Sequence, residues 1–87
     1  MAKHRISEAQ RQWLRVIAAA EDHYRERNAK RTRNRIRDHE PEGATEMPNR
    51  TLKSLARHGF AVCSPHPTLK LSYLWTITAK GREALDG

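Results

Sequence analysis

Apolar residues recur at helical spacing over the first third of the chain. The members of this stripe follow one another at steps of three or four residues: Ile6, Ala9, Trp13, Ile17, Ala20 and Tyr24, widened by Leu14 and Val16. Such spacing places them on one face of an amphipathic helix. Ser7 is a favourable N-cap, and Gln10 stands three residues later, as a capping box requires. We predict a helix from about Ser7 to Asn28, whose aromatic-bearing stripe supplies both core and a homodimer interface.

The segment 25–46 is basic at first and acidic afterwards, with almost no large apolar residue. Its cations are Arg25, Arg27, Lys30, Arg31, Arg33, Arg35 and Arg37, and its later anions are Asp38, Glu40, Glu42 and Glu46. A short helix from about Lys30 to His39, ended by Pro41 and Gly43, is compatible with this pattern. A partly flexible linker is the competing interpretation.

The spacing in the second half of the chain changes from helical to alternating. A helix is predicted from Pro48, in its first turn, to His58, with Leu52 and Leu55 on one face, and Gly59 is a natural residue just past its end.

Two strands and a last helix are predicted after it. Phe60–Cys63 is the first strand, and Pro65 and Pro67 mark a loop because proline cannot sit inside a central strand. The second strand, 71–78, alternates, with one face carrying Leu71, Tyr73, Trp75 and Ile77. Thr78 caps a short helix from Ala79 to Leu85.

Two stretches resemble a known family. Arg50–Val62, with its two leucines three residues apart, a basic residue, Gly59 and an apolar pair, resembles the recognition helix and first wing strand of winged helix-turn-helix proteins. Trp75–Leu85 resembles the second wing strand running into a capping threonine, a glycine and an apolar helix face. The resemblance implies an α+β, mainly α, winged-helix fold of N-terminal helices, recognition helix, two-stranded wing and short C-terminal helix.

In such proteins the recognition helix enters the major groove of double-stranded DNA, and the wing touches the backbone or minor groove. Carried over position by position, the resemblance implicates Asn49, Arg50, Lys53, Ser54 and Arg57 on the helix and His66 and Lys70 in the wing. One departure stands out. The family has a compact apolar helix before the recognition helix, whereas Arg31–Glu46 is polar here and contains Pro41 and Gly43.

The charge pattern adds a second set of candidate residues. Arg50, Lys53 and Arg57 share a helix face, which fits either DNA contact or an ordinary solvated surface. The arginine run suits phosphate contacts that position the protein without specifying sequence, through Arg31, Arg33, Arg35 and Arg37. Two other interpretations of the run stay open: solubility with like-charge disorder, and neutralisation by the acidic residues that follow.

The remaining aromatic and metal-binding candidates fit structural roles. Trp13 and Tyr24 suit the core or a dimer interface. Tyr73 and Trp75 suit packing against the recognition helix better than stacking on single-stranded bases. His58, Cys63 and His66 lack the fourth ligand of a structural zinc site, so no metal and no cofactor is expected. No catalytic set is recognisable, and no enzyme is expected.

Composition bounds these expectations. The 87 residues suit a single domain, 1–87, and the net charge of +7 favours an anionic partner. One cysteine allows no internal disulfide, and the absence of a long apolar run argues against a membrane. We expect a DNA-binding transcriptional regulator of bacterial or phage type in the cytoplasm, at the nucleoid or in a phage host. The alternatives are a winged-helix module docking on an acidic or nucleic-acid-processing protein, and RNA binding through the arginine run.

Overall fold

The structure, a computed structural model, describes residues 5–31 and 39–86. Within them the chain forms, in order, α1 (Glu8–Ala29), α2 (Arg50–Arg57), β1 (Ala61–Pro65), β2 (Tyr73–Ile77) and α3 (Ala79–Asp86). The described part is therefore a small α+β domain with three helices and a two-stranded antiparallel sheet. No described helix is long and apolar enough to cross a membrane.

The start of α1 is set by the predicted capping box. The Ser7 hydroxyl accepts the N–H of Gln10 at 3.1 Å, and Gln10 Oε1 accepts the N–H of Ser7 at 2.9 Å. The predicted stripe is only partly right. Leu14 and Ile17 are fully buried, but Val16 is 44% exposed. The buried face continues instead through Glu21 and Asn28. Both polar side chains can be buried there because each forms a hydrogen bond, Glu21 with the Ile77 N–H and Asn28 with the Glu40 carbonyl.

Local signals set both ends of α2. Asn49, rather than a residue further upstream, is the N-cap, and its Oδ1 accepts the N–H of Leu52 at 2.8 Å. Pro48 thus precedes the helix instead of lying in its first turn. At the other end Gly59 has φ +80°, and the N–H of Phe60 reaches the Leu55 carbonyl at 2.9 Å. This is a Schellman ending, and it confirms the prediction for Gly59.

The sheet differs from prediction at its ends. β1 runs from Ala61 to Pro65, so Pro65 lies in the strand, which an edge strand permits at its last position. β2 begins at Tyr73 rather than Leu71, because Leu71 has φ +60° and cannot continue an extended strand. Cys63 pairs with Trp75 across the hairpin.

The segment before α2 joins the other edge of the sheet. Ala44 forms an isolated bridge with Trp75 through two backbone hydrogen bonds of 2.9 and 2.8 Å. Described residues 39–49 contain no helix. Lys30, where a short helix was predicted to begin, is the C-cap of α1, and most of that predicted helix falls on 32–38, outside the described residues.

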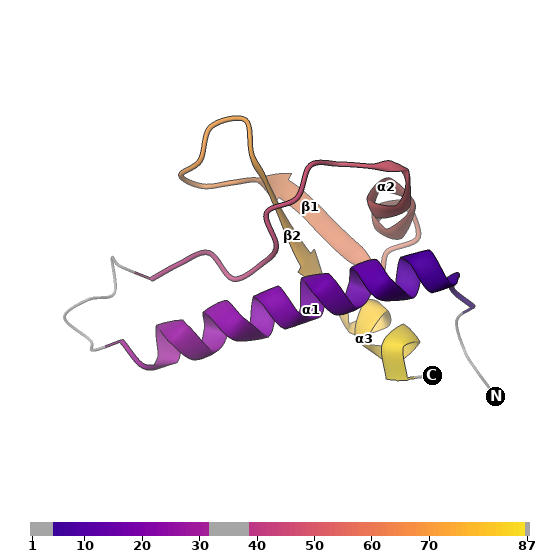
Figure 1. Cartoon of the computed structure of the whole chain (residues 1–87), viewed down its shortest axis with the longest axis horizontal. Helices are drawn as coiled ribbons and strands as arrows, with labels where there is room; N and C mark the ends of the chain where they lie inside the picture. The colour runs from indigo at the N-terminus through magenta and orange to yellow at the C-terminus, as the bar shows by residue number, and fades with distance from the viewer. Residues whose placement is uncertain (1–4, 32–38, 87) are drawn as a thin grey trace.

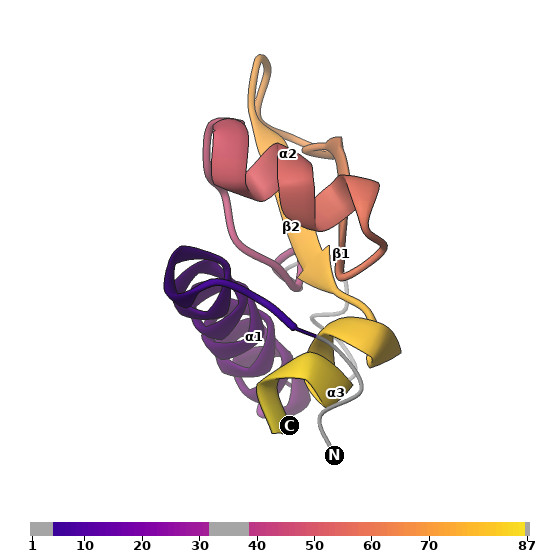
Figure 2. The same ribbon diagram turned by 90° about the vertical axis from the view of Figure 1, so that its right-hand side faces the viewer.

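The core lies where α1 crosses the sheet. Its largest fully buried side chains are Trp75, Leu14, Ile17, Leu52 and Leu55. α1 contacts β2, α2 and α3. Both Figure 1 and Figure 2 show α2 and the loop between the strands on one side of the molecule, with α1 and α3 on the other.

Candidate nucleic-acid interface

Three cations occupy the outer face of α2. Leu52 and Leu55 are fully buried, so the helix turns the opposite face outward. Arg50, Lys53 and Arg57 lie on that face, and all three are exposed. Residues three and four positions apart are neighbours on a helix surface, so the three charges form one patch. Within residues 5–31 and 39–86, none of the three side chains has an ion-pair partner.

The other two predicted residues of α2 hold the helix in place. Asn49 uses its side-chain oxygen to cap α2. The Ser54 hydroxyl accepts a hydrogen bond of 3.1 Å from Gln10 Nε2 of α1. Both side chains are half-buried. They therefore orient the cationic patch, and Arg50, Lys53 and Arg57 are the α2 residues open to a ligand.

The hairpin loop, residues 66–72, is organised by His66. Its Nδ1 accepts the backbone N–H groups of Thr68 at 3.1 Å and Leu69 at 3.0 Å. The backbone N–H of His66 donates to the Ser72 carbonyl at 2.9 Å. His66 is thus an internal acceptor of the loop. Lys70 is exposed, and no ion pair of its side chain occurs in the described part of the chain.

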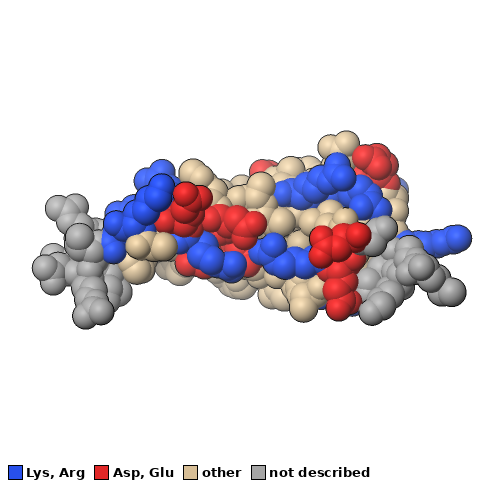
Figure 3. Space-filling model, turned by 90° about the horizontal axis from the view of Figure 1, so that it is seen from below, with Lys and Arg blue, Asp and Glu red and all other residues tan. Residues whose placement is uncertain are grey.

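The arginines that follow the middle of α1 are paired with acidic residues downstream. Arg27 Nε lies 2.9 Å from Glu40, and Arg31 approaches the same carboxylate at 3.4 Å. Arg25 Nε reaches Glu42 at 3.2 Å. Figure 3 shows acidic and basic side chains interleaved on the face seen from below. The acidic residues therefore neutralise the positive charge of these three arginines, which is one of the three interpretations that the sequence leaves open for the arginine run.

The remaining arginines proposed for phosphate contact, Arg33, Arg35 and Arg37, lie outside the described residues.

Asn28 extends the cluster of ion pairs around Glu40, since its side chain donates to the Glu40 carbonyl at 2.7 Å and accepts the Glu40 N–H at 2.8 Å. The segment that starts at His39 is therefore anchored to the end of α1.

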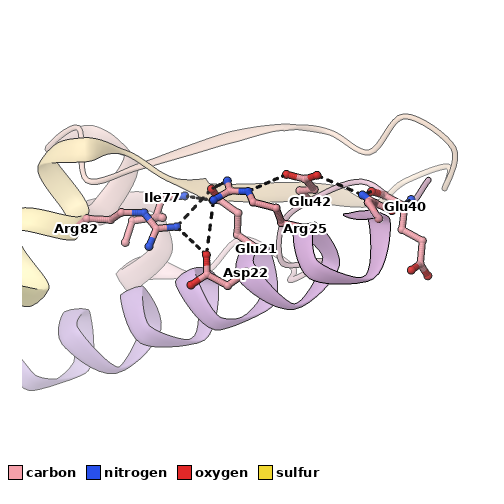
Figure 4. A network of polar contacts seen from close by, with 8 residues as sticks. Glu21, Asp22, Arg25, Glu40, Glu42, Ile77 and Arg82 are labelled. Carbon is pink, nitrogen blue, oxygen red and sulfur yellow. Dashed lines mark hydrogen bonds and ion pairs between the residues drawn. The ribbon is translucent and has the colours of Figure 1, made fainter. Parts of the chain in front are cut away.

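A buried carboxylate joins this cluster to α3 and the sheet. Glu21 accepts the N–H of Ile77 at 3.0 Å and pairs with Arg25 at 2.7 Å and Arg82 at 3.5 Å. Asp22 also pairs with Arg82, at 3.2 Å (Figure 4). The hydrogen bond to Glu42 and the charge of Glu21 raise the pKa of Arg25 above its ordinary value. The network is a structural clasp.

Sequence reasoning missed Glu21, although its spacing was informative. Glu21 stands four residues after Ile17 and seven after Leu14, on the buried face of the helix. An acidic residue within a buried stripe indicates a partnered carboxylate, because an unpaired one would be costly. Its partners could not be named, since Ile77 is 56 residues away.

Tyr73 and Trp75 are predicted to pack against the recognition helix. Trp75 shares the core cluster with Leu52 and Leu55 of α2, whereas Tyr73 lies outside it. Trp75 is 1% exposed, and its Nε1 donates to the Glu46 carbonyl at 2.8 Å. Tyr73 is 37% exposed at the start of β2 and lies outside the core. Trp13 is partly buried against the core, and Tyr24 is half-buried.

Metal-binding chemistry finds no support among the described residues. No group of three His, Cys, Asp or Glu side chains there could hold a metal ion. Burial raises the pKa of the Cys63 thiol, so its reactive thiolate is disfavoured.

The class that these observations define is a small α+β domain that presents one short helix with three exposed cations, none of which has an ion-pair partner in residues 5–31 and 39–86. No protein-family model matches the chain, and neither a curated protein nor a solved structure matches it.

Proposed function

We propose that this protein is a winged-helix, sequence-specific binder of double-stranded DNA that acts in transcriptional regulation. In this proposal α2 is the recognition helix in the major groove, and the hairpin loop is the wing on the flanking backbone. One observation carries the proposal. Arg50, Lys53 and Arg57 form an exposed patch on a helix whose other face is locked into the core, and none of them has an ion-pair partner among the described residues.

The dimensions of α2 suit this role. The major groove of B-form DNA is about 12 Å wide and admits an α-helix, whose diameter with side chains is about 10–12 Å, and the eight residues of α2 extend about 12 Å. Arginine pairs bidentately with guanine O6 and N7, whereas lysine contacts phosphate as a point charge. Arg50 and Arg57, near the two ends of the helix, are the residues we assign to base edges, and Lys53 we assign to phosphate.

The order of the elements supports the same proposal. From α2 onward, a short helix, a two-stranded hairpin and a last helix follow the order that the family resemblance implies, and one long helix precedes them. Described residues 39–49 lack the helix that precedes a recognition helix in that family. In its place, the bridge of Ala44 to Trp75 and the ion pairs of Glu40 and Glu42 hold the chain that leads to α2.

The wing and the arginine run contribute to affinity in this proposal. Lys70, exposed on the loop, is assigned to a phosphate beside the groove. Arg31 would have to leave Glu40 to reach a phosphate, so we give it a smaller share than α2. The assignment of Arg33, Arg35 and Arg37 to phosphate stays a prediction.

A homodimer through α1 is part of the proposal. Beside the buried Leu14 and Ile17, the same helix keeps a partly exposed apolar flank of Ala9, Trp13, Val16, Ala20 and Tyr24. A domain this small gains stability by covering such surface. Two copies would present two α2 helices to two half-sites.

Selection from a randomised duplex pool at near-physiological salt tests the proposal. We expect an enriched motif, and a palindrome would support the dimer. Arg50→Ala with Lys53→Ala should remove the enrichment. The matched control, Arg27→Ala with Lys30→Ala, removes the same charge from cations that are ion-paired and should keep the motif.

Two results would contradict the proposal. Retention of duplexes without any enriched motif would show binding by charge alone. No retention at all would overturn DNA binding and favour docking on an acidic protein.

A further inference from the structure

The hairpin loop carries an unusual leucine beside its closing residue, Ser72. Leu71 has φ +60°, the left-handed region that residues with a Cβ seldom occupy. Its side chain is 94% exposed, the highest value among the exposed large apolar residues of the described chain. Strained conformations of this kind cluster at functional sites and persist where the surroundings impose them.

Hydrogen bonds of His66 hold the backbone on both sides of Leu71. His66 accepts two backbone N–H groups with Nδ1 and closes the loop through its own N–H to Ser72. Pro65 and Pro67 fix the backbone on both sides of His66. The backbone before and after Leu71 is therefore restrained by hydrogen bonds.

Leu71 is not used by the fold. Leu69, two residues earlier, lines a pocket of about 170 Å³ together with Met47 and Tyr73. Leu69 also lines a second pocket of about 300 Å³ that reaches Tyr24. Leu71 lines neither pocket. It is thus an apolar side chain held out into solvent.

The charge around Leu71 indicates the kind of partner. Lys70 is exposed next to it, and α2 with its three unpaired cations lies on the same side of the molecule (Figure 2). A partner that accepts these cations is anionic. The minor groove of duplex DNA combines phosphate-lined edges with apolar sugar walls and stacked bases, and proteins insert leucine there as a wedge.

We propose that Leu71 is such a wedge: the loop inserts it into the minor groove beside the α2 site, where it partly unstacks one base step and bends the duplex. The inference rests on the proposed DNA-binding function and adds a distortion of the DNA to it. Lys70 neutralises the adjacent phosphate, and the His66 hydrogen bonds restrain the loop on insertion.

Fluorescence of 2-aminopurine tests the wedge. The probe is a duplex carrying the motif enriched by the wild-type protein, with 2-aminopurine placed at one flanking position at a time. Unstacking should raise the emission several-fold at one step with the wild-type protein. Leu71→Ala should abolish this rise and lower duplex affinity by less than about tenfold, since α2 still binds. Leu71→Met should keep the rise, and Leu69→Ala, the matched control, should keep it too.

Emission that stays flat at every position, or that Leu71→Ala leaves unchanged, would overturn the wedge while motif selection upholds the proposed function. Failure of the wild-type protein to bind any duplex would overturn both. A photocrosslinker in place of Leu71 shows whether the residue contacts DNA or a second copy of the chain. A crosslink to a DNA strand supports the wedge, whereas a crosslink only to a second copy of the chain would assign Leu71 to a protein contact and overturn it.

Discussion

Glu21 is the residue on which the three layers of the domain converge. Its side chain comes from α1, accepts a backbone N–H of β2 and pairs with Arg82 of α3. Only 10% of the side chain is exposed. Removing such a carboxylate is destabilising, because its former partners stay buried without the hydrogen bond or the opposite charge that replaced their contact with water.

Replacing Glu21 therefore tests how the domain is held together. Glu21→Ala leaves the Ile77 N–H without its acceptor and Arg82 without the buried carboxylate. We expect the free energy of unfolding to fall by about 2–4 kcal/mol, measured by urea denaturation followed by tryptophan fluorescence.

Glu26→Ala is the matched control. Glu26 also sits on α1 and pairs with a cation, Lys30, but both side chains are exposed, so its loss should cost less than about 1 kcal/mol. Equal losses in the two variants would show that the network around Glu21 is no more than surface charge.

At the scale of elements, the signals that the sequence carries reliably are short-range. The capping box of Ser7 and Gln10 and the glycine after α2 act within one turn of helix, and both are confirmed. Errors arise where long-range contacts decide. Residues 39–46 carry no helical or alternating pattern, and what holds them is a bridge to Trp75 and pairing with α1.

The candidate site was predictable to a similar extent. The spacing of Arg50, Lys53 and Arg57 is visible in the sequence, and the structure leaves them exposed. Whether a cation has a partner is a long-range property. Arg31 and Lys53 look alike in the sequence, but only Arg31 finds a carboxylate, Glu40, in the described chain.

The junction of α3 with the α2–β1 turn offers a test at this scale. Thr78 Oγ1 caps Gly81, and a Cβ at Gly81 would collide with the Phe60 carbonyl and lie 2.7 Å from Ile77 Cγ1. We expect Gly81→Ala to lower the thermal midpoint by several degrees, because overpacking here costs about 1–3 kcal/mol.

The opposite substitution elsewhere is the control for Gly81. Ala19 lies exposed within α1, so Ala19→Gly should cost about 1 kcal/mol through helix propensity alone. Alanine is ordinarily the better helix former. A higher midpoint for Gly81→Ala would therefore contradict the close packing of α3 on the turn.

For the whole molecule, some cations form ion pairs within the fold and others stay available to a ligand. The net charge is +7, yet Arg25 and Arg27 in the second half of α1 pair with Glu42 and Glu40, and Lys30, just after the helix, pairs with Glu26. The cations of α2 and Lys70 have no such partners among the described residues. Arg5, Arg11 and Arg15 near the start of α1 and Lys80 of α3 also lack an ion pair among the described residues, so the unpaired positive charge is not confined to α2 and the hairpin loop. A net positive charge of this size steers the approach of an anionic partner.

The salt dependence of duplex binding tests this division most directly. On duplex DNA each neutralised phosphate contributes about −0.9 to the slope of log K against log salt. Because Lys53 is assigned to a phosphate and Arg50 to a base edge, Arg50→Ala with Lys53→Ala should make the slope shallower by about 1. Arg27→Ala with Lys30→Ala, which removes the same charge, should change it by less than about 0.5. Equal changes in the two variants, or a larger one in the second, would contradict the assignment of α2 as the DNA-binding element.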